Sequence, residues 1–218
     1  MANNCDFSMR ITGGEAEIKE LISMLRWEGK FKDSGLGRIY SFYVDEDILP
    51  TSLADIYQVD GYGDCAWSVL TAMQYYNGRT PCLESETDRL GLVVELFSSE
   101  PGCQFQEHIL IAKGVVCIED CVDYEEHWVD NYDSLEAYNK DNETDFTEDM
   151  VDDGCVRIGG FGDSYGCFLE VEDLEEYFSP EFDVERRAAL DTVISSCEEL
   201  SKNNDVKPEK VGDITKER

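Results

Sequence analysis

The sequence predicts an α+β fold with a mainly antiparallel sheet and helices on one of its faces. Strand-like and helix-like patterns follow one another in the order strand, helix, strand, strand, helix, strand, and a hairpin closes the series. Strands that follow one another directly are typical of antiparallel sheets rather than of repeated βαβ units. The chain of 218 residues is 42% apolar and 11% aromatic, so it can bury a sizeable core.

Four elements are predicted before residue 58. Residues 4–12 alternate between apolar and polar side chains, which indicates a half-buried strand. Residues 15–28 place isoleucines and leucines at helical spacing, with glutamates in the first turn, where the helix dipole favours negative charge. Residues 38–44 are β-branched and aromatic and predict a second strand. A short helix is expected over residues 51–57 within a polar connection.

The middle of the chain is predicted to hold one helix and several strands. Residues 60–69 are expected to form a glycine-rich turn that enters a short strand, and Ser68 is suited to cap a helix over residues 69–76. Residues 90–102 predict a strand that ends in a Pro-Gly turn. Residues 103–124 predict two strands joined by a Lys-Gly turn, which is a hairpin.

The C-terminal part is predicted to hold two short strands within residues 154–171 and helices over residues 172–178 and 184–200. The last eighteen residues are polar and lack an apolar face, so we expect them to be frayed. The chain is therefore predicted to have three parts: an α+β core over 1–125, an acidic extension packed on it over 126–200, and a tail over 201–218.

Acidic residues are concentrated in one stretch of the chain. The formal net charge is −31, and residues 119–200 carry twenty-seven acids against four bases. Such a charge repels nucleic acid and anionic membranes, and it attracts basic proteins, including those whose grooves hold DNA or RNA. A solvated acidic surface is the simpler interpretation. Aromatic residues, however, lie among the fifteen acids between Glu119 and Asp153, and solubility alone requires none.

The cysteines predict a cytosolic protein with reduced thiols. Their number, nine, is odd, and neither a signal peptide nor an apolar run of membrane-spanning length is present in the sequence. Cys117, Cys121 and His127 are a loose match to a metal site, because three residues separate the cysteines and no second pair follows at the spacing of a zinc finger. We therefore expect no metal and no cofactor.

Three stretches of the sequence, MANNCDFSMRITGG, GYGDCAWSV and VVELFSSEPGCQFQEHILIAKGVV, resemble the YubB-like ferredoxin-like domain of plasmid and phage proteins. Asn3 and Asn4 depart from the family, in which a tryptophan is more usual at this place. The resemblance covers about residues 1–125 and implies a ferredoxin-like fold and an origin in a mobile element. It implies no enzyme activity and supplies no catalytic residue.

Catalysis is not expected from the residues themselves either. Glu107 and His108 are the most suggestive pair, with Glu95 and Glu100 nearby in sequence, but neighbours on a strand point to opposite faces. The glycine-rich stretch at 159–166 lacks the spacing and the lysine of a phosphate-binding loop.

A calcium site is also weakly supported. The residues Asp149, Asp152 and Asp153 could hold a cation loosely, but no stretch has the pattern of a calcium-binding loop, so a solvated acidic loop is favoured.

The pattern of acids and aromatics favours a non-catalytic, anti-CRISPR-like inhibitor that imitates nucleic acid. Its expected partner is a basic nucleic-acid-binding host protein in the host cytosol, such as a CRISPR effector, and the protein itself is expected to bind neither nucleic acid nor membrane. The alternative is an acidic scaffold or chaperone-like binder of a basic phage or host protein. Tyr124 and the other aromatics of the stretch could be anchors or core. The predicted partner-binding residues are Asp123, Glu125, Glu126, Trp128, Asp130, Tyr132, Asp133, Glu136, Tyr138, Asp141, Glu143, Asp145, Glu148, Asp149, Asp152 and Asp153.

Overall fold

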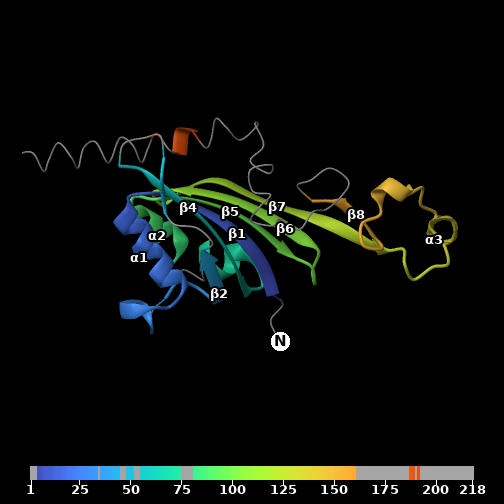
Figure 1. The fold of residues 1–218 in the computed structure, drawn as a ribbon, viewed down its shortest axis with the longest axis horizontal. Helices are drawn as coiled ribbons and strands as arrows, with labels where there is room; N and C mark the ends of the chain where they lie inside the picture. Colours follow the sequence, from blue (N-terminus) through green and yellow to red (C-terminus); the bar gives the residue numbers. More distant parts are fainter. Residues whose placement is uncertain are drawn as a thin grey trace, which may run out of the picture.

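An eight-stranded antiparallel sheet dominates the structure, a computed structural model (Figure 1). The strands lie in the order β2-β4-β1-β5-β6-β7-β8, and β3 pairs with β4 beside β2. The strands are β1 (Asn4–Gly13), β2 (Ile39–Val44), β3 (Leu49–Pro50), β4 (Tyr57–Ala66), β5 (Val93–Glu100), β6 (Phe105–Ala112), β7 (Val115–Trp128) and β8 (Cys155–Gly159). The predicted antiparallel α+β fold is confirmed. The structure describes residues 4–33, 35–44, 48–51, 55–74, 81–160, 187–189 and 191.

Within the described residues, three α-helices and three shorter helical turns accompany the sheet, besides the helical residues 187–189. They are α1 (Glu15–Leu25), α2 (Leu83–Leu90), α3 (Leu135–Asn142), the 3-10 helices η1 (Gly29–Phe31) and η3 (Glu148–Met150), and the π-helix η2 (Leu70–Gln74) among the described residues. α1 and α2 lie on the same side of the sheet (Figure 1). The inward residues of β1, for example Phe7 and Ile11, pack in one cluster with Ile18 and Leu21 of α1. The alternation predicted for β1 therefore separates the main core from the opposite face.

The opposite face of the sheet carries a smaller apolar cluster. Val93 of β5 and Leu110 of β6 pack there with Ala189, which belongs to the described helical residues 187–189. The prediction of helices on one face only is therefore wrong at this point. The apolar side of the predicted helix over 184–200 indicated burial, but it could not indicate which face of the sheet would receive it. The predicted elements over 161–178 and the tail over 201–218 lie outside the described residues.

The glycine-rich segment predicted as a turn is instead the middle of β4. A Cβ atom at Gly63 would lie 2.2 Å from the carbonyl oxygen of Ser41, and one at Gly61 would lie 2.6 Å from the ring of Phe42. The glycines therefore let β2 and its aromatic rings approach β4 closely. The helix predicted over 51–57 is absent at its described positions, because residues 51, 55 and 56 are not helical and Tyr57 already belongs to β4, where it pairs with Pro50 of β3. Residues 52–54 lie outside the described residues.

We expect Gly63→Ala to lower the free energy of unfolding by about 2 kcal/mol, because an added methyl group would collide with backbone that cannot move freely. Gly91→Ala is the control: Gly91 has a φ of 67° but open space around its Cβ position, so only conformational strain of about 1 kcal/mol is expected. Urea unfolding measures the loss of stability in each variant. Equal losses in the two variants would show that the methyl group at position 63 causes no collision.

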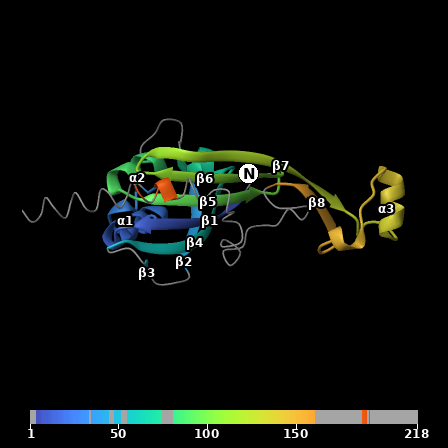
Figure 2. The ribbon, with the colours of Figure 1, turned by 90° about the horizontal axis from the view of Figure 1, so that it is seen from above.

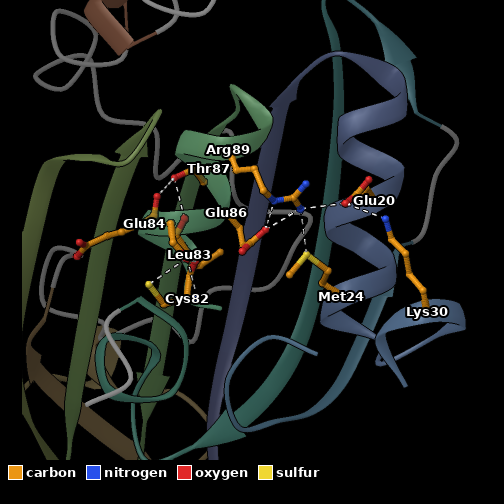
Figure 3. Close-up of polar contacts among 10 residues, drawn as sticks. Glu20, Met24, Lys30, Cys82, Leu83, Glu84, Glu86, Thr87 and Arg89 are labelled. Atoms are coloured by element: carbon orange, nitrogen blue, oxygen red, sulfur yellow. Dashed lines mark hydrogen bonds and ion pairs between the residues drawn. The ribbon is translucent and has the colours of Figure 1, made fainter. Parts of the chain in front are cut away.

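The sequence patterns did not predict α2. They did predict that Ser68 caps the short helix that follows it, which is η2. Ser68 Oγ accepts a hydrogen bond from the Thr71 amide at 3.1 Å, just before η2 begins. α2 buries only a narrow apolar face, and its C-terminus is marked by Gly91 in the left-handed conformation. Figure 3 shows that Arg89 of α2 joins the two helices, because its guanidinium lies 2.6 Å from Glu86 and 2.9 Å from Glu20 of α1.

β7 continues beyond the sheet core as one strand of a ribbon. Its pairing with β6 ends at Asp123, and Tyr124 to Trp128 pair with β8. The ribbon leads into residues 129–154, which we call the acidic lobe. Figures 1 and 2 show α3 of this lobe far from α1, beyond the end of the sheet. The predicted boundary at residue 125 thus falls inside a continuous strand, and the division into three parts stays a prediction.

Candidate functional site: the acidic lobe

The acidic lobe is held together by local hydrogen bonds around α3. Ser134 caps the helix, since its Oγ accepts a hydrogen bond from the Ala137 amide at 3.1 Å. Asn139 fixes the segment after the helix: its Oδ1 accepts from the Phe146 amide at 3.1 Å and from Thr144 Oγ1 at 2.8 Å, and its Nδ2 donates to the Phe146 carbonyl at 2.7 Å. The lobe is therefore an ordered unit with its own polar framework.

The lobe also has a small apolar core. Val129, Tyr138, Phe146 and Val156 form one buried cluster. His127 of β7 joins the cluster to the ribbon, because its Nδ1 lies 2.9 Å from the Tyr138 hydroxyl and its ring centroid lies 4.9 Å from that of Phe146. Tyr138, which was predicted to bind the partner, thus supports the lobe from inside, and its partner-binding role stays a prediction.

Two aromatic side chains remain on the surface of this part of the chain. Trp128, at the end of β7, is 48% exposed, and Tyr132 is 37% exposed. Tyr124 is buried at 3%. The aromatics left open by the sequence thus divide into core residues and two candidate anchors, Trp128 and Tyr132.

Almost all the predicted acidic positions face solvent. Glu126 is the exception, because it is half-buried and its carboxylate accepts a hydrogen bond from Arg157 Nε at 3.0 Å. The exposed positions are Asp123, Glu125, Asp130, Asp133, Glu136, Asp141, Glu143, Asp145, Glu148, Asp149, Asp152 and Asp153. The structure thus places these carboxylates along one ribbon and the lobe at its end.

Few cations offset this charge within the lobe. Lys140 is its one basic residue, and Arg157 at its base lies 3.9 Å from Asp152. A hydrogen bond from Thr147 lowers the pKa of Asp149, which favours the charged form. At neutral pH the lobe therefore presents a negative surface, with the exposed ring of Tyr132 on it and the exposed ring of Trp128 at the end of β7 directly before it.

The described residues do not contain a group of three His, Cys, Asp or Glu side chains placed to hold a metal ion. The three residues considered for a loose cation, Asp149, Asp152 and Asp153, are all exposed.

The pair Glu107 and His108 divides between the two faces of the sheet, as their adjacency on a strand predicted. Glu107 accepts hydrogen bonds from Ser98 Oγ at 2.7 Å and from the Val69 amide at 2.8 Å. His108 Nε2 instead lies 2.9 Å from Glu95 Oε1, and its ring stacks on Phe97 at 4.1 Å. The buried His108–Glu95 pair was missed, although the hairpin register, which sets Phe97 opposite His108, is the signal that could have found it.

Glu100 has a structural position in the turn between β5 and β6. Its carboxylate accepts hydrogen bonds from the amides of Gly102, at 3.1 Å, and Cys103. The Glu-Pro-Gly stretch at residues 100–102 is therefore a turn that the Glu100 side chain closes.

Comparison with protein-family models, with curated proteins and with solved structures finds no match to this chain. The resemblance to the YubB-like family stays a prediction. Within the part of the chain that the structure describes, no helix has both the length and the apolar composition needed to cross a bilayer.

Proposed function

We propose that this protein is a non-catalytic inhibitor that occupies the nucleic-acid-binding groove of another protein with its acidic lobe. The observation that carries the proposal is the position of the lobe. It stands beyond the end of the sheet on a two-stranded ribbon, where a groove can surround it (Figure 2). Its acidic residues, apart from the half-buried Glu126 on the ribbon, are exposed to solvent. An acidic face lying flat on the core could not enter a groove in this way.

The physical basis is imitation of the phosphate backbone. Double-stranded DNA carries one negative charge per about 1.7 Å of helix axis, and a groove that binds it is lined by lysine and arginine. Carboxylates on a folded support attract the same side chains and raise the association rate. Trp128 and Tyr132 then supply the apolar contact that slows dissociation, since aromatic residues are enriched at the energetic centres of interfaces.

The proposed target is a basic nucleic-acid-binding effector of host defence, such as a CRISPR complex, in the host cytosol. This choice rests on the negative charge of the lobe and on the resemblance to proteins of mobile elements. A mobile element benefits when a nucleic-acid-binding defence protein is blocked. An acidic scaffold or chaperone-like binder of a basic protein is the alternative that the experiment below separates.

We also propose that β1 to β5 form a ferredoxin-like core. The strand order β2-β4-β1-β5 supports this, together with the positions of α1 between β1 and β2 and of α2 between β4 and β5. In this arrangement the core is the support, and β6, β7 and β8 extend it toward the lobe.

The test begins with capture of the target from host lysate on the immobilised full chain, followed by competition. We expect duplex DNA or RNA to displace the captured protein. We also expect affinity for the target to fall steeply as the salt concentration rises. The Debye length is about 8 Å at physiological ionic strength and becomes shorter with added salt, so attraction between exposed charges weakens.

Trp128→Ala tests the anchor in the same assay. It should weaken binding by about 30-fold, which corresponds to about 2 kcal/mol, and leave the melting temperature nearly unchanged because the side chain is exposed. A target that binds nucleic acid and this protein together, without competition, would exclude the mimic and favour the scaffold.

A further inference from the structure

A second surface, at the other edge of the sheet, exposes more aromatic side chains than the lobe does. β2 is the last strand at that edge. Five of the seven Trp and Tyr side chains that are exposed in the described part of the chain belong to β2, to β4 and the residue after it, and to the turn that follows α1. They are Trp27, Tyr40, Tyr43, Tyr62 and Trp67. The proposed function of the lobe does not use this surface.

A groove runs along this edge. It has a volume of about 490 Å³ and lies between the C-terminal end of α1, at Leu25–Glu28, and residues 39–43 of β2. In the described part of the chain no strand pairs with the outer edge of β2, because β3 pairs with β4 instead. Arg26 Nε reaches across the groove and donates to the carbonyl of Phe42 at 3.1 Å, which shows that this backbone group is accessible from outside the sheet.

The backbone holds Trp27 in an unfavourable conformation at the wall of the groove. The Glu28 amide donates to the Ser23 carbonyl at 2.9 Å, which closes α1 with a left-handed residue, and that residue is Trp27 with a φ of 55°. Glycine is preferred at this position of a helix end. The indole is 37% exposed and lies over Gly35, where a Cβ atom would come within 2.5 Å of the ring. A strained, exposed tryptophan beside a groove points to a binding role.

The charge of this edge is opposite to that of the lobe. Residues 26–38 carry four bases and two acids, in a chain with a net charge of −31. Arg26 and Arg38 are both exposed, and neither forms an ion pair with a carboxylate in the part of the chain that the structure describes. The edge therefore complements an acidic ligand, whereas a second copy of this chain would place the same bases against each other.

We propose that the β2 edge binds an extended, acidic peptide segment of a partner protein. The segment adds as a strand to β2 and displaces the Arg26 guanidinium from the Phe42 carbonyl. Its carboxylates then meet Arg26 and Arg38, and its side chains pack on Trp27 and Tyr40. A bulge between Ile39 and Ser41 interrupts the ladder, so the new strand pairs with residues 41–44 and the aromatic contacts supply the remaining affinity. This surface is independent of the lobe. The protein thus has two binding surfaces, one for a basic partner at the lobe and one for an acidic peptide at the β2 edge.

The probe is a phage-displayed library of random twelve-residue peptides, selected on the full chain, with the enriched peptides then synthesised. We expect them to be acidic, to alternate between β-branched and polar residues, and to slow hydrogen exchange of β2 amides when bound. Trp27→Gly should weaken their binding at least 10-fold without lowering the melting temperature by more than a few degrees, since glycine suits the φ of 55°. Tyr40→Ser, which changes a side chain that is 53% exposed, should weaken binding as well.

Trp128→Ala is the matched control, because it removes an exposed tryptophan at the end of β7, beside the lobe, and should leave peptide binding unchanged. Failure of the lobe to bind a basic target would not affect this result, so the two proposals fail separately. The β2 proposal is overturned if selection yields no peptide or only basic peptides, or if both Trp27→Gly and Tyr40→Ser bind the selected peptides with full affinity. It is also overturned if analytical ultracentrifugation shows a dimer that Trp27→Gly dissociates, because a second copy would then occupy the edge.

Discussion

Replacing Asp141, Glu143, Asp145 and Glu148 by lysine is expected to abolish target binding, with a loss of at least about 100-fold in affinity. All four side chains are exposed, and none forms an ion pair among the described residues. The substitutions therefore convert attraction to a basic groove into repulsion, since like charges at an interface cost several kcal/mol. Asp149 is left unchanged, because Thr147 hydrogen-bonds its carboxylate and the change would also disturb the lobe itself.

The matched control carries the same change in net charge at exposed acids away from the lobe, namely Glu15, Asp33, Asp55 and Asp88. This control should keep most of the affinity if position within the lobe matters. Isothermal titration calorimetry with the captured target measures both variants, and thermal unfolding checks that both remain folded. Equal losses in the two variants would show that overall charge alone drives association, and full affinity of the lobe variant would end the mimic proposal.

The second large effect is expected in the core, where Glu107→Ala should lower the free energy of unfolding by about 3 kcal/mol or more. The buried carboxylate accepts hydrogen bonds from Ser98 Oγ at 2.7 Å and from the Val69 amide at 2.8 Å at the start of η2. Alanine would leave these buried donors without an acceptor, at about 1–3 kcal/mol each. Glu107→Gln keeps one acceptor oxygen and should cost about 1 kcal/mol or less at neutral pH.

The same residue makes stability depend on pH. Burial raises the pKa of Glu107 above its ordinary value of 4.5, and the hydrogen bonds from Ser98, Val69 and Leu70 only partly offset this. The folded state therefore holds the proton more tightly than the unfolded chain does. The contribution of Glu107 to stability is largest below pH 4.5 and falls as pH rises through the raised pKa.

Urea unfolding of the natural protein and of Glu107→Gln between pH 4 and about pH 8 isolates this contribution, because other carboxylates titrate in both proteins. The difference in stability between them should shift in favour of Glu107→Gln as pH rises. A difference that stays constant over the whole range would show that Glu107 keeps the same pKa in the folded and unfolded states.

Local patterns predicted the strands well where one face is apolar and the other polar. β1, β2, β5 and the hairpin of β6 and β7 all lie within a few residues of their predicted positions. β4 was not predicted over this stretch because glycine is common in turns, and only the close approach of β2, through the Ser41 carbonyl and the Phe42 ring, explains why this strand needs glycine. α2 was lost because few of its eight residues are apolar.

The acidic lobe was visible in the sequence as a stretch of charge, but its geometry was not. Trp128 and Tyr138 have similar acidic neighbours in sequence, yet Trp128 is 48% exposed and Tyr138 is 6% exposed. The difference arises from the contact of Tyr138 with His127, eleven residues away, which no local pattern encodes. The exposed β2 edge was likewise hidden, because strand order depends on pairings between distant segments.

The central position of β1 has a consequence for synthesis on the ribosome. β1 pairs with β4 on one side and β5 on the other, and both are made later; Gly13 meets Tyr57, and Thr12 meets Val93. Translation proceeds at about 5–20 residues per second, so the apolar side chains of β1 remain unpaired for several seconds before β4 or β5 leaves the ribosome. During translation the apolar side chains of this strand are therefore exposed, and ribosome-associated holdases should crosslink to Phe7 and Met9 in nascent chains that end before β4.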